Sequence, residues 1–264
     1  MTTSHQHKAE TRFVEIAGKK IQLTVAGDGP PLVYLHSAGG ETDWMPFHDK
    51  LANHFRVHVP AHPGFALSSG LEQIRDFQDL VWHYVDLFES QGWKNVPVVG
   101  FSIGAWLGVE LAILRPELVS RLVMVAAAGL HVPSAPMAEL FIDDLVKLRH
   151  LLFYDPNDPA IDLALPRSTQ DDRILMWLRA REATARIGWS PYLHNPKLPH
   201  HLRRVKCPTL LLWGDSDYLI PPAHGEFYVK HIAGAKLEIL PQCGHMLPFE
   251  KTDAFVEKTV RWLK

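Results

Sequence analysis

The feature that most constrains the fold is a series of short apolar runs separated by helical patterns. Six such runs follow one another along the chain: LVYLH, FRVHVP, VPVV, VSRLVMVAA, PTLLLW and KLEIL. Two alternating, β-branched segments precede them, Thr11–Ala17 and Lys19–Val25, with Gly18 as the turn. Strands that alternate with helices form βαβ units, so we predict an α/β fold whose central sheet of about eight strands is mostly parallel and flanked by helices.

The helical patterns include one long stretch in the first half and a larger insertion in the second. Apolar residues recur at spacings of three and four from Ile74 to Ser90. Residues 130–206 separate two of the apolar runs and carry two amphipathic candidates, Met137–Phe153 and Asp171–Gly188. We therefore predict one domain over residues 1–264, with a core of 1–129 and 207–264 and a helical cap, 130–206, over the strand ends.

The composition fits a globular protein and gives no reason to expect nucleic acid or a membrane as partner. Of the 264 residues, 47% are hydrophobic and 21% are charged, and the formal net charge is -2. The first residues, MTTSHQHKAE, contain no apolar secretory segment. No apolar run approaches the ~20 residues that span a bilayer. We expect a soluble, cytoplasmic protein.

The cysteines and histidines form no metal-binding pattern. Cys207 and Cys243 are too few for a disulfide framework, and their spacing matches no zinc motif. The 16 histidines are scattered, and pairs such as His200–His201 lack carboxylates or thiols at ligand spacing. We expect no metal site.

A single serine between glycines marks the junction of an apolar run and a helical pattern, in VPVVGFSIGAWLG. At a sharp strand-to-helix turn the hydroxyl of Ser102 would be pushed out of the sheet, and side chains at residues 100 and 104 would collide. Gly100, Gly104 and Ala105 meet that requirement. The free N–H groups of the helix that follows suit a developing negative charge. The alternative is that Ser102 only caps a helix.

A serine nucleophile needs a histidine base and an acid that orients the base. Asp215 and Asp217 follow the apolar run LLLW, and His245 lies in a glycine-containing loop after KLEIL. Both loops follow carboxyl ends of predicted strands, where parallel sheets hold their sites. We favour Asp217 because it lies deeper in its loop, while Asp215 is placed to cap the turn. The alternative for His245 is a core or capping histidine.

The loop LHSAGG (Leu35–Gly40) follows the third predicted strand and is rich in small residues. Such a loop can supply a second backbone N–H to an oxyanion. The alternative is an ordinary glycine-rich turn.

Together these segments resemble the α/β-hydrolase fold superfamily, in the group with a cap of helices. HSAGG is similar to its oxyanion loop, PAHPGFALS to its Pro-Gly-Phe-Gly segment, GFSIGA to its nucleophile elbow, WGDSDYLIP to its acid loop and CGHMLPFEKTDAF to its histidine loop. The resemblance covers nearly the whole chain, and the order serine, aspartate, histidine also agrees. It implies Ser102 as nucleophile, Asp217 as acid and His245 as base, with the N–H groups of Ile103 and Ala38 as oxyanion donors.

Two residues depart from the pattern of the superfamily. Ser37 follows His36 where the superfamily usually has glycine, and Ala66 replaces the second glycine of Pro-Gly-Phe-Gly. A hydroxyl at Ser37 can shift the loop or add a donor, and such a change would affect the position of the Ala38 N–H but not that of Ile103.

The resemblance implies a serine hydrolase that needs no metal or organic cofactor. An apolar cap, with Leu145, Leu148, Met176 and Trp177, favours a small, largely apolar ester or lactone as substrate, although such residues often only pack. The candidate substrate-binding residues are Ser37, Phe101, Trp106, Phe141, Trp189 and Met246. Epoxide hydrolases and haloalkane dehalogenases on this fold use a carboxylate nucleophile, so the serine at residue 102 argues against both activities. The alternatives are carbon–carbon hydrolysis of ring-opened dienones, or a ligand receptor without turnover.

Overall fold

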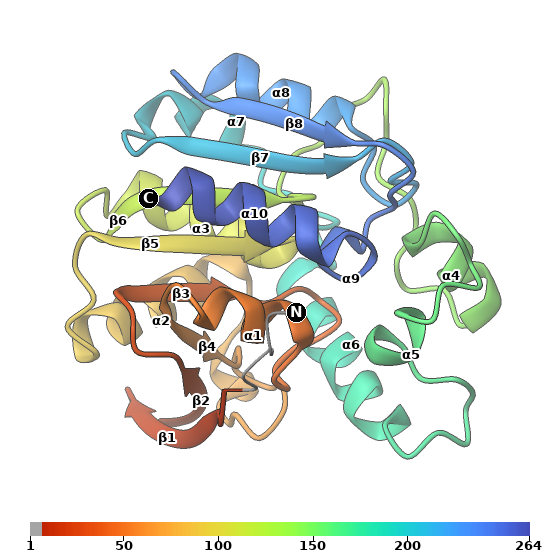
Figure 1. Cartoon of the computed structure of the whole chain (residues 1–264), viewed down its shortest axis with the longest axis horizontal. Helices are drawn as coiled ribbons and strands as arrows, with labels where there is room; N and C mark the ends of the chain where they lie inside the picture. Colours follow the sequence, from red (N-terminus) through yellow and green to blue (C-terminus); the bar gives the residue numbers. More distant parts are fainter. Residues whose placement is uncertain (1–6) are drawn as a thin grey trace, which may run out of the picture.

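The computed structural model describes residues 7–264, so most of the polar N-terminal segment, residues 1–6, lies outside the described residues. The described strands form one eight-stranded sheet in the order β1-β2-β4-β3-β5-β6-β7-β8 (Figure 1). The first two pairings, β1 with β2 and β2 with β4, are antiparallel, and the others are parallel. The mostly parallel α/β sheet predicted from the sequence is thereby confirmed. The strands are β1 (Glu10–Ile16), β2 (Lys19–Ala26), β3 (Pro31–Leu35), β4 (Arg56–Pro60), β5 (Val96–Phe101), β6 (Val119–Val125), β7 (Thr209–Gly214) and β8 (Lys236–Leu240).

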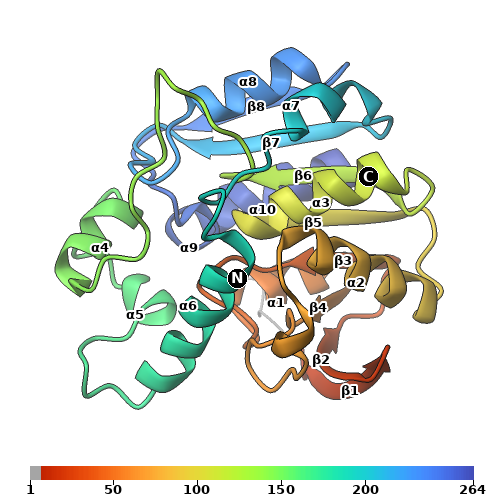
Figure 2. The same ribbon diagram turned by 180° about the vertical axis from the view of Figure 1, so that it is seen from behind.

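Helices cover both faces of the sheet. One face carries α1 (Pro46–Ala52) and α10 (Thr252–Leu263), which contact each other (Figure 1). The other face carries α2 (Phe77–Ser90), α3 (Ile103–Leu114) and α8 (Ala223–His231), as Figure 2 shows. The central strands are therefore buried on both sides, which explains their nearly continuous apolar sequences. The remaining short elements are η1 (Leu71–Gln73) and α9 (Leu247–Glu250).

The insertion segment, residues 130–206, runs between β6 and β7 and is helical. It contains α4 (Leu145–Leu152), α5 (Ile161–Ala164), α6 (Ile174–Gly188), α7 (Leu198–His201) and η2 (Leu202–Arg204). Figure 1 shows α4, α5 and α6 beside the edge to which the parallel strands point. The backbone of Gly129 donates to the Leu193 carbonyl at 3.0 Å and accepts from the Asn195 N–H at 3.0 Å. The chain therefore returns at residue 195 to the point where it left the core.

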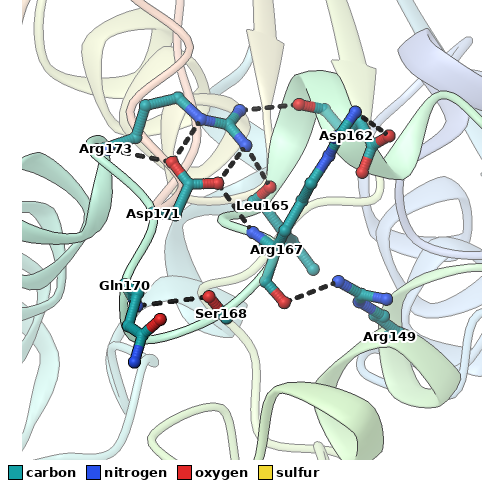
Figure 3. Close-up of polar contacts among 8 residues, drawn as sticks. All are labelled: Arg149, Asp162, Leu165, Arg167, Ser168, Gln170, Asp171 and Arg173. Carbon is teal, nitrogen blue, oxygen red and sulfur yellow. Dashed lines mark hydrogen bonds and ion pairs between the residues drawn. The ribbon is translucent and has the colours of Figure 1, made fainter.

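Polar contacts hold the loop between α5 and α6 (Figure 3). The Arg173 guanidinium donates to both carboxylate oxygens of Asp171, at 3.0 and 2.9 Å, and to the backbone carbonyls of Asp162 and Leu165. The Asp171 carboxylate also accepts the backbone N–H of Arg167 at 2.8 Å. The ion pair between Arg173 and Asp171 thus links the two ends of this loop.

Three helices begin later than the apolar spacing predicts, and one of them, α6, begins at Ile174 rather than Asp171. Helix α2 begins at Phe77 rather than Ile74, because the Asp76 side chain accepts the Asp79 N–H and caps the helix there. Helix α4 begins at Leu145 rather than Met137, because Asp144 accepts the N–H groups of the first turn. Ile74 is nonetheless buried, so it shares the apolar stripe without being helical. Apolar spacing alone therefore identified the packing face but not the helix start.

Candidate active site

Ser102 lies at the turn between β5 and α3 in a strained backbone conformation. Its φ is 55° and its ψ is -112°, in the region that favours glycine. A Cβ atom at Gly100 would lie 2.3 Å from the Gly104 carbonyl oxygen, and one at Gly104 would lie 2.0 Å from the Leu35 carbonyl oxygen. The backbone therefore passes too closely for side chains on either side of the serine, as the sequence predicts.

His245 joins Ser102 to Asp217. Its Nε2 atom lies 3.2 Å from the Ser102 hydroxyl oxygen, and its Nδ1 atom lies 2.8 Å from one Asp217 carboxylate oxygen. The other Asp217 oxygen accepts the backbone N–H groups of Leu219 and Ile220 at 3.1 and 2.8 Å. All three side chains are buried. An imidazole oriented by a carboxylate in this way can accept a proton from a serine hydroxyl.

Asp215, the alternative acid, points elsewhere. Its Oδ1 atom accepts the Ser216 hydroxyl at 2.8 Å and the backbone N–H of Cys243 at 3.4 Å. It therefore ties together the loops after β7 and β8, and Asp217 is the carboxylate that reaches the histidine.

Two backbone N–H groups near Ser102 are free. Within residues 7–264, neither the Ile103 N–H nor the Ala38 N–H donates to a protein acceptor. Ile103 is the first residue of α3, where a helix leaves its N–H groups without intrahelical partners. Both groups can therefore donate to an incoming oxygen atom.

The Ser37 hydroxyl, by contrast, is already engaged. It donates to Glu41 Oε1 at 2.6 Å and accepts the Gly39 N–H at 2.9 Å, while the Ser37 N–H donates to Glu41 Oε2 at 2.9 Å. Burial raises the pKa of the Glu41 carboxyl, and the hydrogen bonds from Ser37 oppose that effect. The sequence analysis missed Glu41, since a carboxylate one residue after a Gly-Gly pair carries no distinctive pattern.

Two buried histidines support the same loop from behind. The backbone N–H of His62 donates to His36 Nε2 at 2.9 Å, so the His36 proton lies on Nδ1 and is donated to the Ser37 carbonyl at 2.8 Å. Burial lowers the pKa of His36 to about 4. The imidazole is therefore neutral at pH 7, and its hydrogen bond to the Ser37 carbonyl supports the loop of residues 37–40.

A cavity opens beside Ser102 and His245 under the insertion segment. Of the candidate substrate-binding residues, Ser37, Phe141 and Met246 line it. Most of the other lining side chains are apolar and include Leu140, Leu148, Leu165 and Trp177. This composition suits a largely apolar group next to the serine.

The cavity also has two charged side chains, Glu41 and Arg181. The Arg181 guanidinium lies 4.5 Å from the Trp177 ring centroid and donates to the carbonyls of Leu140 and Ile142. It was not among the sequence candidates. A lone arginine on an amphipathic helix usually faces solvent, so the sequence contains no sign that Arg181 lines the cavity. Only its position in the folded protein shows this.

The remaining substrate-binding candidates lie elsewhere. Phe101 is buried beneath His245, with 5.4 Å between the ring centroids. Trp106 stacks on Phe77 of α2, with 3.3 Å between the ring centroids. Trp189 is 62% exposed on the insertion segment. The cavity is therefore formed by other residues than these three, because two of them pack the core and one faces solvent.

Among residues 7–264, no three His, Cys, Asp or Glu side chains gather in a way that could hold a metal ion. Across the same residues, no helix combines the length and apolarity that crossing a membrane requires.

A mostly parallel sheet with a serine at the turn after its fifth strand, and a histidine–aspartate pair beside it, defines an α/β hydrolase. The sequence profile of the alpha/beta hydrolase family matches residues 32–258, and the chain belongs to this family.

Individual relatives share the class but differ in their substrates. The chain is 26% identical to 2-hydroxy-6-oxo-6-(2'-aminophenyl)hexa-2,4-dienoic acid hydrolase of Metapseudomonas resinovorans, over 96% of this chain and 90% of the relative. It is also 26% identical to pimeloyl-(acyl-carrier protein) methyl ester esterase of Nitrosomonas europaea, over 85% and 92%. The solved structure of a serine hydrolase involved in carbazole degradation has a TM-score of 0.81 at 25% identity, over 97% and 99%.

Proposed function

We propose that this hydrolase cleaves a carboxylic ester or lactone of a small, largely apolar substrate through an acyl-enzyme. The observation that carries the proposal is the position of His245, which hydrogen-bonds both Ser102 and Asp217 in a buried site. The apolar cavity beside Ser102 supports the substrate class. In this proposal the insertion segment acts as the cap of the site, and no cofactor takes part.

The proposed reaction has two acyl-transfer steps. His245 accepts the Ser102 proton as the serine oxygen attacks the carbonyl carbon, and the N–H groups of Ile103 and Ala38 stabilise the oxyanion. The alcohol leaves with the proton held by His245, which leaves an ester on Ser102. Water, deprotonated by His245, then releases the acid. Asp217 keeps the Nδ1 proton in place throughout.

A second candidate is hydrolysis of a carbon–carbon bond in a ring-opened dienone. Relatives that are named as hydrolases of 2-hydroxy-6-oxodienoic acids favour it. Arg181 favours it as well, because its positive charge in the cavity suits the carboxylate of such a substrate, which an apolar ester lacks. The nucleophile, base and acid would be the same residues.

Turnover of defined substrates tests the proposal. The pure protein would be assayed with p-nitrophenyl acetate and butyrate, a lactone, and 2-hydroxy-6-oxo-6-phenylhexa-2,4-dienoate. We expect Ser102→Ala to lower kcat by roughly 10⁵–10⁶-fold, as loss of a serine nucleophile does elsewhere. Ser216→Ala, which removes a hydroxyl bonded to Asp215, is the matched control and should retain activity.

The substrate panel separates the candidates. Preference for the esters or lactone supports the first proposal, and preference for the dienoate supports the second. A wild-type protein that turns over none of them and resists labelling by a fluorophosphonate probe would contradict both, and would favour a receptor role.

A further inference from the structure

The pair formed by Ser37 and Glu41 lies beside the nucleophile and has no role in the reaction described above. We propose that Glu41 is a positioning residue for acyl transfer, which holds the loop of residues 37–40 so that the Ala38 N–H faces the carbonyl oxygen of the substrate. This inference rests on the proposed serine hydrolase function and assigns a role to the Ser37 departure from the superfamily pattern.

The hydrogen bonds around Ala38 carry the argument. The N–H group before it, on Ser37, donates to Glu41 Oε2 at 2.9 Å. The N–H group after it, on Gly39, donates to the Ser37 hydroxyl at 2.9 Å, and that hydroxyl donates to Glu41 Oε1 at 2.6 Å. Within the described residues, the Ala38 N–H has no protein acceptor. Glu41 thus binds the Ser37 N–H directly and the Gly39 N–H through the Ser37 hydroxyl, and it leaves the Ala38 N–H for the substrate.

Burial favours this one conformation of the loop over others. Glu41 is only 3% exposed, so water does not compete for its carboxylate oxygens. Ser37 is buried as well, so breaking either bond would leave a buried polar group without a partner. The loop has therefore a strong preference for the conformation in which both Ser37 groups reach the carboxylate.

The absence of a side chain at residue 39 fits the same arrangement. A Cβ atom at Gly39 would lie 2.4 Å from Glu41 Oε1 and 3.3 Å from the Ser37 hydroxyl oxygen. An alanine there would displace the carboxylate while leaving its charge in the site. Gly39→Ala therefore tests whether the position of the Glu41 carboxylate matters, because this variant moves the carboxylate without removing it.

The bonds to Ser37 also set the order of the expected effects. A glutamine at residue 41 places an NH2 group where the carboxylate has its second oxygen, so in the observed geometry it cannot accept both Ser37 donors. An alanine at residue 37 removes only the hydroxyl bonds and keeps the bond from the backbone N–H. Glu41→Gln should therefore cost more than Ser37→Ala.

The experiment uses the preferred substrate of the wild type. It measures kcat and KM of Glu41→Gln, Ser37→Ala, Gly39→Ala and the double variant that combines Ser37→Ala with Glu41→Gln. Loss of one oxyanion donor costs about 10²–10³-fold in kcat, so displacing one should cost Glu41→Gln about 10–100-fold. We expect KM to change by less than about threefold, because the donor acts mainly in the transition state. The double variant should be no slower than Glu41→Gln, since both substitutions break the same contact.

Inhibitor binding distinguishes positioning from general damage. A trifluoromethyl ketone forms an oxyanion on Ser102, so its inhibition constant should weaken in Glu41→Gln by the same factor as kcat. Binding of the carboxylic acid product should be nearly unchanged. Thr42→Ser, in the same loop, is the control and should match the wild type in both measurements.

Each remaining outcome overturns the inference. A Glu41→Gln variant with wild-type kcat shows that the carboxylate does not hold the donor. A loss of kcat with an equal loss of product binding and a large fall in Tm shows a structural role only. A wild type without turnover on any substrate overturns this inference together with the proposed function, whereas wild-type turnover with an unaffected Glu41→Gln overturns this inference alone.

Discussion

The core and the insertion segment form opposite walls of one cavity, and they are held in place by different forces. On the core wall the backbone passes so closely that Gly104 allows no Cβ atom, and Ser102, Asp217 and His245 are all buried. On the other wall, the loop before α6 depends on an ion pair whose Arg173 side chain is 43% exposed. The insertion segment also exposes apolar side chains, such as Leu175 at 68%.

This difference separates reactivity from substrate contact. Atoms that must lie within tenths of an ångström are placed by backbone collisions and buried hydrogen bonds, which leave few alternatives. Many side chains that line the cavity come from the insertion segment, which has weaker constraints, so substitutions there should cost little. Relatives with the same fold can therefore act on different substrates without rebuilding the sheet.

The largest effect should come from the acid of the core wall. Asp217→Asn should lower kcat by about 10⁴-fold, because an amide favours the wrong tautomer of His245. Asp215→Asn is the matched control, since Asp215 binds Ser216 and Cys243 instead of the histidine. Steady-state kinetics on the preferred substrate measures both. Similar losses in the two variants would contradict the assignment of Asp217.

The next effect compares one glycine from each wall. Gly104→Ala places a Cβ atom 2.0 Å from a backbone oxygen, so the free energy of unfolding should fall by about 3 kcal/mol or more. Gly188→Ala, in α6, brings the new Cβ atom closest to a side-chain atom, Leu193 Cδ2 at 2.5 Å, rather than to a backbone oxygen. Its cost should stay within about 1 kcal/mol, because alanine also favours the helix. Urea unfolding measures both, and equal costs would remove the difference between the walls.

Low pH should destabilise the folded core through histidines that are buried and neutral. Burial lowers the pKa of His36 to about 4 and that of His48 and His83 to about 3, from 6.5. Below pH 6.5 the unfolded chain binds protons that the folded chain does not, so each contribution is complete above pH 6.5 and is lost as the pH falls toward 4. Each of these histidines should lower the free energy of unfolding by about 2 kcal/mol when the pH falls from 7.5 to 5.

His83→Phe isolates one of these contributions. Both ring nitrogens of His83 lack a partner among the described residues. The substitution should therefore raise the free energy of unfolding at pH 7.5 by about 1 kcal/mol and reduce the difference between pH 7.5 and 5. Urea unfolding at the two pH values gives the result, and an unchanged pH difference would show that His83 does not titrate on unfolding.

The smallest effect should come from the ion pair of the insertion segment. Arg173→Ala should change the free energy of unfolding by less than about 1 kcal/mol, since the pair is partly exposed. Hydrogen exchange in residues 162–173 should nevertheless become faster, because the loop loses its contacts with Asp171 and Leu165. Arg115→Ala, which breaks exposed pairs with Glu89 and Glu117 in the core, is the control. Unchanged exchange would show that the loop has other support.

The sequence was most informative where geometry permits few residue types. The strained turn at Ser102 excludes side chains at residues 100 and 104, so the glycines there were readable as a motif. The placement of Asp217 and His245 followed from the rule that parallel strands hold their sites at their carboxyl ends.

Other parts of the site were not readable because many residue types serve equally well. Glu41 reaches Ser37 only because the loop turns back on itself, and a carboxylate four residues from a serine has no special pattern. The apolar candidates Trp106 and Trp189 carry the same signal as Phe141, yet only Phe141 faces the cavity. Their orientation depends on which helix faces pack, and apolar spacing does not record that.

The backbone contacts of Gly129 with Leu193 and Asn195 have a consequence for how such a protein can change over time. A loop that is closed at its base can be lengthened, shortened or exchanged at a small entropic cost, since that cost grows only logarithmically with length. The chain between these contacts can therefore be exchanged without changing the sheet that holds Ser102, Asp217 and His245. New substrate ranges can be acquired by replacing this stretch of chain while the nucleophile, base and acid stay where they are.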